Sequence, residues 1–128
     1  MWEAVSLYRN LFERGATLEE IIKRERIEVR RQTLPNDVPS MQMWVGNHSV
    51  FIIDTRLKDT DYRRAIFHEL YHHFRPSKQS ADPAHPNSHD YLARVFAEIS
   101  LQFYGHAIPP MGRLELTLQE IDKTLEFN

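Results

Sequence analysis

The sequence predicts an α+β domain in which a small antiparallel sheet packs against helices. Apolar residues recur at helical spacing in several stretches of the chain, which indicates amphipathic helices. The segments 41–45 and 49–53 flank Gly46 and Asn47, a pair that favours the turn of a β-hairpin. Because 128 residues suit one hydrophobic core, we expect the range 1–128 to form a single domain.

The composition limits the chemistry open to this chain. With 16 basic and 18 acidic residues the formal charge is −2, which argues against direct nucleic-acid binding. The chain has no cysteine, so disulfides, thiolate zinc sites and cysteine nucleophiles are excluded. Residues 1–5 lack the basic start of a signal peptide, and no run of apolar residues is long enough to span a membrane. We therefore expect a cytoplasmic protein without a membrane partner.

Two helices and a strand are predicted before the hairpin. Residues 2–12 carry an apolar face at helical spacing, and Gly15 is expected to end this first helix as a C-terminal cap. Thr17 and Glu20 form a capping box that begins the second helix. Residues 27–30 then alternate in polarity like an edge strand.

The hairpin itself holds candidates for peptide contact. We interpret Met43 and Trp44 as a candidate peptide-binding rim, with core packing expected for one of the two. Either strand, 41–45 or 49–53, is a candidate edge for pairing with an extended peptide backbone. His48 lies in the turn, where we expect it to contact solvent.

The sequence predicts a helix over residues 59–74. Asp59 or Thr60 is expected to cap its start, and Arg75 with Pro76 to end it. Four apolar residues recur at intervals of four and give a stripe that faces the core. They are Tyr62, Ile66, Leu70 and Phe74.

Residues 68–72 of this helix read His-Glu-Leu-Tyr-His, a pattern typical of zinc hydrolases. His68 and His72 lie one helical turn apart on the same face, so their imidazoles can bind one ion at about 2.0–2.1 Å. Glu69 lies about 100° further round the helix. From there its carboxylate reaches a water on the ion and acts as the general base. The pattern predicts a metal centre with Zn(II), or Mn(II) as the alternative.

A third ligand is expected from the helix that follows. Residues 77–87 are predicted to be a loop that returns the chain to the metal side, and 88–103 to be a helix capped by its first serine. Asp90, in the first turn of that helix, is the preferred third ligand, and His89 is its main rival. The remaining alternatives are Glu98, His106 and no third protein ligand.

The other histidines carry weaker predictions. His73 points about 100° away from the ligand pair, so we expect a surface or supporting histidine and not a ligand. His85 and His106 fall in predicted loops near the cleft, where substrate contact and plain solvent exposure are both open. Thr117 with Glu120 is expected to begin a last short helix.

The order of these elements and their motifs resembles the ImmA/IrrE metallopeptidases. The resemblance rests on the apolar strand 49–54, the motif at 68–72 and the acidic start of 90–97, and it covers roughly residues 17–112. It implies a zincin-like metallopeptidase fold. It also implies a zinc-dependent peptidase that cleaves helix-turn-helix repressors of mobile elements or stress regulons.

The resemblance also implies roles for individual residues. His68 and His72 correspond to the zinc ligands, Glu69 to the base, and Asp90 to the position of the third ligand. Three residues depart from the family pattern: Asp90 replaces the usual glutamate, Tyr71 a glycine and Arg94 an asparagine.

Residues and resemblance together predict a zinc-dependent endopeptidase that cleaves a protein, expected to be a helix-turn-helix transcriptional repressor. The competing hypothesis is a non-catalytic metal-binding regulator that binds a repressor or toxin without cleaving it. Glu69 argues against this alternative, because a site that only binds metal does not require a base. A histidine-rich helix without metal is the third hypothesis, since short motifs also arise by chance.

Overall fold

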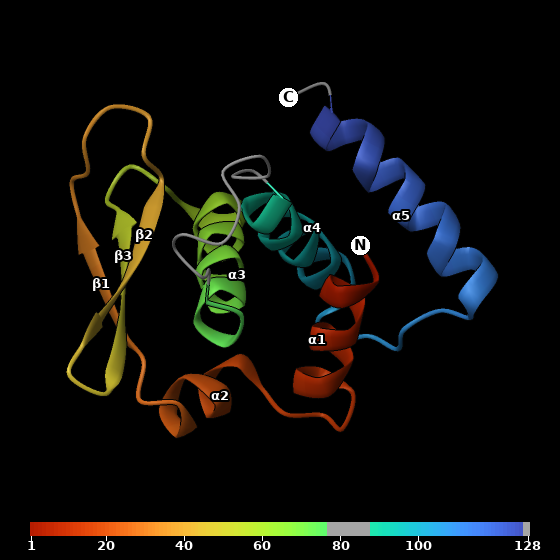
Figure 1. The fold of residues 1–128 in the computed structure, drawn as a ribbon, viewed down its shortest axis with the longest axis horizontal. Coiled ribbons are helices and arrows are strands. Elements are labelled where there is room, and N and C mark those ends of the chain that lie inside the picture. The colour runs from red at the N-terminus through yellow and green to blue at the C-terminus, as the bar shows by residue number, and fades with distance from the viewer. Residues whose placement is uncertain (77–87, 127–128) are drawn as a thin grey trace.

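The computed structural model describes residues 1–76 and 88–126, which contain five helices and a three-stranded sheet (Figure 1). The elements follow in chain order: α1 (Trp2–Phe12), α2 (Leu18–Arg24), β1 (Glu28–Gln32), β2 (Ser40–Val45), β3 (His48–Asp54), α3 (Asp59–Phe74), α4 (Ser88–Phe103) and α5 (Met111–Glu126). The α+β class expected from the sequence is confirmed. None of the described helices combines the length and apolar character needed to cross a membrane.

The sheet has the strand order β1-β3-β2, with β3 in the centre. The hairpin of β2 and β3 is antiparallel as predicted, and Gly46 in its turn adopts φ +64°, which glycine tolerates. The expectation of a purely antiparallel sheet is wrong, because β1 pairs with β3 in parallel. Residues 33–39, which connect β1 to β2, cross the position of the central strand. β1 and β2 therefore form the two edges of the sheet, and β3 lies between them.

The central strand is buried on both faces. Phe51 and Ile53 face the helices and belong to the main core. Val50 and Ile52 face the other way and pack with Leu34, which comes from the connection between β1 and β2. A strand covered on both faces carries a continuous apolar run, and β3 has one.

Helix α3 is the middle layer of the molecule. Figure 1 shows it between the sheet and α4, with α1 beside α4 and α5 on the far side. Three fully buried phenylalanines join these layers, Phe51 from β3, Phe67 from α3 and Phe96 from α4. Burial of each such ring contributes about 1.5–3 kcal/mol to stability. The predicted core stripe of α3 is confirmed at Ile66 and Leu70, which are buried.

The predicted helix caps are only partly confirmed. Thr17 caps α2 as predicted, since its Oγ1 accepts a hydrogen bond from the Glu20 N–H at 3.1 Å. Helix α3 spans the predicted residues, but its N-cap is Lys58, without a side-chain cap bond. Asp59 and Thr60 already lie inside the helix and therefore do not cap it. Likewise, Ser88 is the first residue of α4 and not the residue before it.

The last helix is longer than predicted. It begins at Met111 and not at Thr117, because the apolar stripe of Leu114, Leu118 and Ile121 extends a turn further back. All three side chains are buried. Thr117 lies within the helix, where its hydroxyl donates to the Arg113 carbonyl one turn earlier.

His73 fastens α3 to the sheet and to α2. Its Nε2 lies 3.0 Å from a carboxylate oxygen of Glu25, and its Nδ1 lies 2.7 Å from the hydroxyl of Ser49. The amide of Gln42 donates to the same hydroxyl, and the ring of Trp44 stacks on the imidazole at 5.1 Å. A carboxylate only accepts, so Nε2 carries a proton, and its hydrogen bond holds the pKa of Glu25 below its usual value. His73 is therefore a supporting residue behind the motif.

Replacing His73 with alanine is expected to lower the free energy of unfolding by about 2 kcal/mol or more. The change leaves a cavity and removes the acceptor of the buried Ser49 hydroxyl, which then keeps only the hydrogen bond from Gln42. Urea unfolding followed by circular dichroism measures this effect. The exposed His106 provides the matched control, since His106→Ala should change stability by less than about 0.5 kcal/mol. Equal loss in the two variants would contradict the supporting role.

Candidate metal centre

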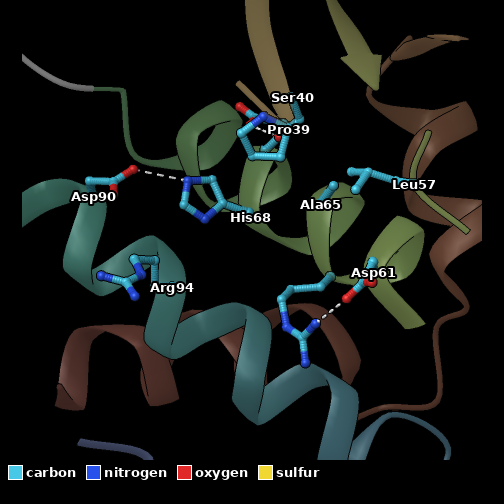
Figure 2. A pocket seen from close by; sticks show the side chains of 10 residues that line it. Pro39, Ser40, Leu57, Asp61, Ala65, His68, Asp90 and Arg94 are labelled. Carbon is cyan, nitrogen blue, oxygen red and sulfur yellow. Dashed lines mark hydrogen bonds and ion pairs between the residues drawn. The ribbon is translucent and has the colours of Figure 1, made fainter. Parts of the chain in front are cut away.

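The structure brings His68, His72 and Asp90 into one cluster. Their ligand atoms all lie within 4.8 Å of one another. The two Nε2 atoms are 3.2 Å apart, and Asp90 Oδ1 lies 3.0 Å from His68 Nε2 and 3.5 Å from His72 Nε2. Figure 2 shows the carboxylate of Asp90 directed from α4 towards the His68 ring on α3.

These distances fit a tetrahedral zinc site. With ligand bonds of about 2.0–2.2 Å, two ligand atoms of a tetrahedron lie about 3.3–3.6 Å apart. The three observed separations run from 3.0 to 3.5 Å, so an ion needs only small shifts of the side chains. Two imidazoles and one carboxylate leave the fourth position for water or substrate, as catalytic zinc sites require. The binding of metal by this cluster stays a prediction.

The packing of α4 on α3 places Asp90 beside the histidine pair. His68 and His72 share a face of α3, while Asp90 lies in the first turn of α4. Ala93 and Ala97 are buried on α4, and such small side chains let two helices approach closely. The sequence contained this signal, because the small residues fall on the face next to the aspartate.

The electrostatics of the cluster prepare Asp90 to act as a ligand. Hydrogen bonds first from His68 and then from His72 hold the pKa of Asp90 well below its usual range. The carboxylate is therefore ionised at neutral pH and needs to lose no proton before it binds a cation. Its side chain is 55% exposed, so an ion can enter from solvent.

Glu69 is buried next to the cluster and is held by a partner that the sequence did not reveal. Only 4% of Glu69 is exposed. The hydroxyl of Ser40, the first residue of β2, donates to Glu69 Oε2 at 2.5 Å. A charge-assisted hydrogen bond of this kind fixes the direction of the carboxylate. No local pattern predicts the contact, because its two residues are 29 positions apart.

A cavity of about 400 Å³ opens beside His68 and Glu69. It lies between the start of β2 and the helices α3 and α4, as Figure 2 shows. Ten residues line it: Pro39, Ser40, Leu57, Asp61, Arg64, Ala65, His68, Glu69, Asp90 and Arg94. A candidate base and two of the three cluster residues thus line one accessible cavity. This arrangement suits the hydrolysis of a bound substrate.

None of the rival ligands among the described residues belongs to the cluster. The ring of His89 packs on His72 at 4.8 Å, and burial lowers the pKa of His89, but its nitrogens are not part of the cluster. Glu98 accepts a hydrogen bond from Arg64 at 2.6 Å. His106 is exposed and lines no described part of the cavity. His85 and the predicted loop 77–87 lie outside the described residues.

The hairpin differs from its predicted packing. We expected either Met43 or Trp44 to enter the core, but they are 42% and 49% exposed. The reason is that β2 is an edge strand, covered by α3 over only part of its length. His48 is the first residue of β3 and is half-buried, so it lies beside the turn and not in it as expected. Since β3 has strands on both sides, only β2 keeps a free edge for a peptide in this hairpin.

Tyr71, a departure from the resembled family, belongs to the core. Its ring is 2% exposed, and it packs on Phe96 with 5.7 Å between the centroids. Burial raises the pKa of its phenol.

Comparisons of the chain with family models, curated proteins and solved structures found no match. The functional assignment therefore rests on the geometry of the site.

Proposed function

We propose that this protein is a zinc-dependent endopeptidase with a zincin-like catalytic domain. The observation that carries the proposal is the set of ligand-atom separations of 3.0–3.5 Å among His68, His72 and Asp90. Glu69 next to this cluster supplies the base that a hydrolase needs. Zn(II) is the proposed metal, with Mn(II) as the alternative, because two imidazoles with one carboxylate suit both.

Each residue of the site has a defined task. His68, His72 and Asp90 would hold the ion. When bound, zinc lowers the pKa of a water ligand and polarises the carbonyl of the scissile bond. Glu69 accepts the proton of the attacking water and passes it to the leaving amine, while Ser40 keeps its carboxylate directed into the cavity.

The proposed substrate is a protein, and the resemblance to ImmA/IrrE peptidases favours a helix-turn-helix transcriptional repressor in the cytoplasm. The unpaired edge of β2 offers hydrogen-bonding groups to an extended peptide. Ser40 begins this strand and also contacts Glu69, so a peptide paired with β2 passes close to the base.

Incubation of the zinc-loaded protein with unfolded casein and with a panel of helix-turn-helix repressors tests this proposal. We expect fragments that mass spectrometry detects and that disappear when a chelator removes the metal. The metal dependence follows from the need for an activated water. A repressor that binds tightly but stays intact, together with uncut casein, would favour the regulator that binds without cleavage.

A further inference from the structure

Arg94 lies in the wall of the candidate active site and has no charged partner in the part of the chain that the structure describes. It lies on α4, one turn after Asp90, and lines the 400 Å³ cavity together with His68 and Glu69. It also lines a neighbouring hollow, which His68 and Ala97 share. Within residues 1–76 and 88–126, its guanidinium has no hydrogen-bond or ion-pair partner. Figure 2 shows Arg94 on the same helix as Asp90, with His68 on the neighbouring helix.

Both carboxylates that could neutralise Arg94 on its own helix are engaged elsewhere. Residues four positions apart on a helix are neighbours, so Asp90 and Glu98 are the natural partners of Arg94. Asp90 instead contacts His68 at 3.0 Å, and Glu98 accepts a hydrogen bond from Arg64 at 2.6 Å. Arg64 in turn also binds Asp61 at 2.8 Å. As far as the described residues go, Arg94 therefore keeps its five N–H donors for a ligand.

The charge of the cavity suits an anion once the metal is bound. Three carboxylates and two guanidinium groups line it, so a divalent ion leaves one positive charge in excess. The carboxylates have partners of their own: Asp61 binds Arg64, Glu69 binds Ser40 and Asp90 belongs to the cluster. Among the charged side chains that line the cavity, Arg94 is the one without a hydrogen-bond or ion-pair partner within the described residues. A guanidinium binds a carboxylate through two parallel hydrogen bonds, which gives both affinity and orientation.

We propose that Arg94 forms a carboxylate-binding subsite and determines specificity for peptides that carry a carboxylate next to the scissile bond. The inference rests on the proposed peptidase function and names its substrate class. In a peptide, the carboxylate belongs either to an acidic side chain or to the C-terminus. The first case makes the protein selective for Asp or Glu near the cleavage site, and the second directs it to the end of a chain.

Three hydroxamate probes separate these sources. Each is a succinyl hydroxamate, whose hydroxamate group binds zinc, joined to one amino acid. Glutamic acid amide offers only a side-chain carboxylate, glutamine with a free C-terminus offers only the terminal one, and glutamine amide offers neither. The affinity of the zinc-loaded protein for each probe is measured by calorimetry. We expect one acidic probe to bind about tenfold or more tightly than the neutral probe, and its identity names the source.

Variants of Arg94 assign the preference to this residue. Arg94→Gln should remove the advantage of the acidic probe and leave the affinity for the neutral probe unchanged, whereas Arg94→Lys should keep part of the advantage. Arg63→Gln is the matched control, because Arg63 is an exposed arginine of α3 that lines neither hollow. It should preserve the preference.

The outcomes for the subsite and for the proposed function are distinguishable. Equal affinity of wild-type protein for all three probes would overturn the carboxylate subsite while the binding of hydroxamates upholds the metal centre. Persistence of the preference in Arg94→Gln would also overturn the assignment. Failure to load zinc, with no affinity for any hydroxamate, would overturn the proposed function and this subsite with it.

Discussion

Replacing Glu69 with glutamine is expected to abolish peptide cleavage while the protein keeps its fold and its zinc. The amide has nearly the shape of the carboxylate, and its oxygen still accepts the hydrogen bond of Ser40. It cannot take a proton from water, so the rate of cleavage should fall by about 10²–10⁴-fold or more. The measurement compares initial cleavage rates and zinc content of the two proteins.

The exposed Glu115 of α5 supplies the control for this change, because Glu115→Gln alters charge in the same way far from the motif. We expect this variant to keep full activity. A Glu69→Gln protein as active as the wild type would show that Glu69 is not the base. A variant that loses its zinc would instead make Glu69 a ligand.

Removal of the Asp90 carboxylate is expected to weaken zinc binding about tenfold or more. Asp90→Ala deletes one of the three ligand atoms of the cluster. Asp90→Glu keeps a carboxylate at this position, so it should retain binding. His89→Ala should change the affinity far less, because the imidazole of His89 packs against His72 without joining the cluster. Calorimetric titration of zinc into the three metal-free variants measures the order of affinities.

If Asp90 is not a ligand, the same three variants should behave differently. If Asp90 only favours the start of α4 through the helix dipole, Asp90→Ala should lower stability by about 0.3–1 kcal/mol and leave zinc affinity unchanged. If His89→Ala alone releases the metal, the site holds three histidines. The carboxylate ligand that we assign to Asp90 would then be wrong.

Features set by near neighbours in the chain were predictable. The period of the apolar residues and Pro76 gave the limits of α3, and Gly46 marked the hairpin turn. The spacing of His68 and His72 placed both on one helical face, since a helix fixes residues four apart. These features depend on dihedral preferences and on the helical repeat, which the sequence carries locally.

Features that depend on contacts between distant parts of the chain could not be predicted from the sequence. The parallel pairing of β1 with β3 depends on where the 33–39 connection runs, and nothing in the strand residues records that path. The start of α5 was misplaced because Thr117 resembles a cap but lies within a helix that begins a turn and a half earlier. The role of Ser40 in holding Glu69 was not predicted, because it depends on a contact between residues 29 positions apart.

The zinc content of the protein, purified without chelator and without a histidine tag, tests the central claim most directly. Elemental mass spectrometry should find about one zinc per chain, because His68, His72 and Asp90 offer a single three-ligand site. His72→Ala, which removes one ligand, should contain far less. Wild-type protein that carries no metal and takes up none when zinc is added would contradict the metal centre and the peptidase function built on it.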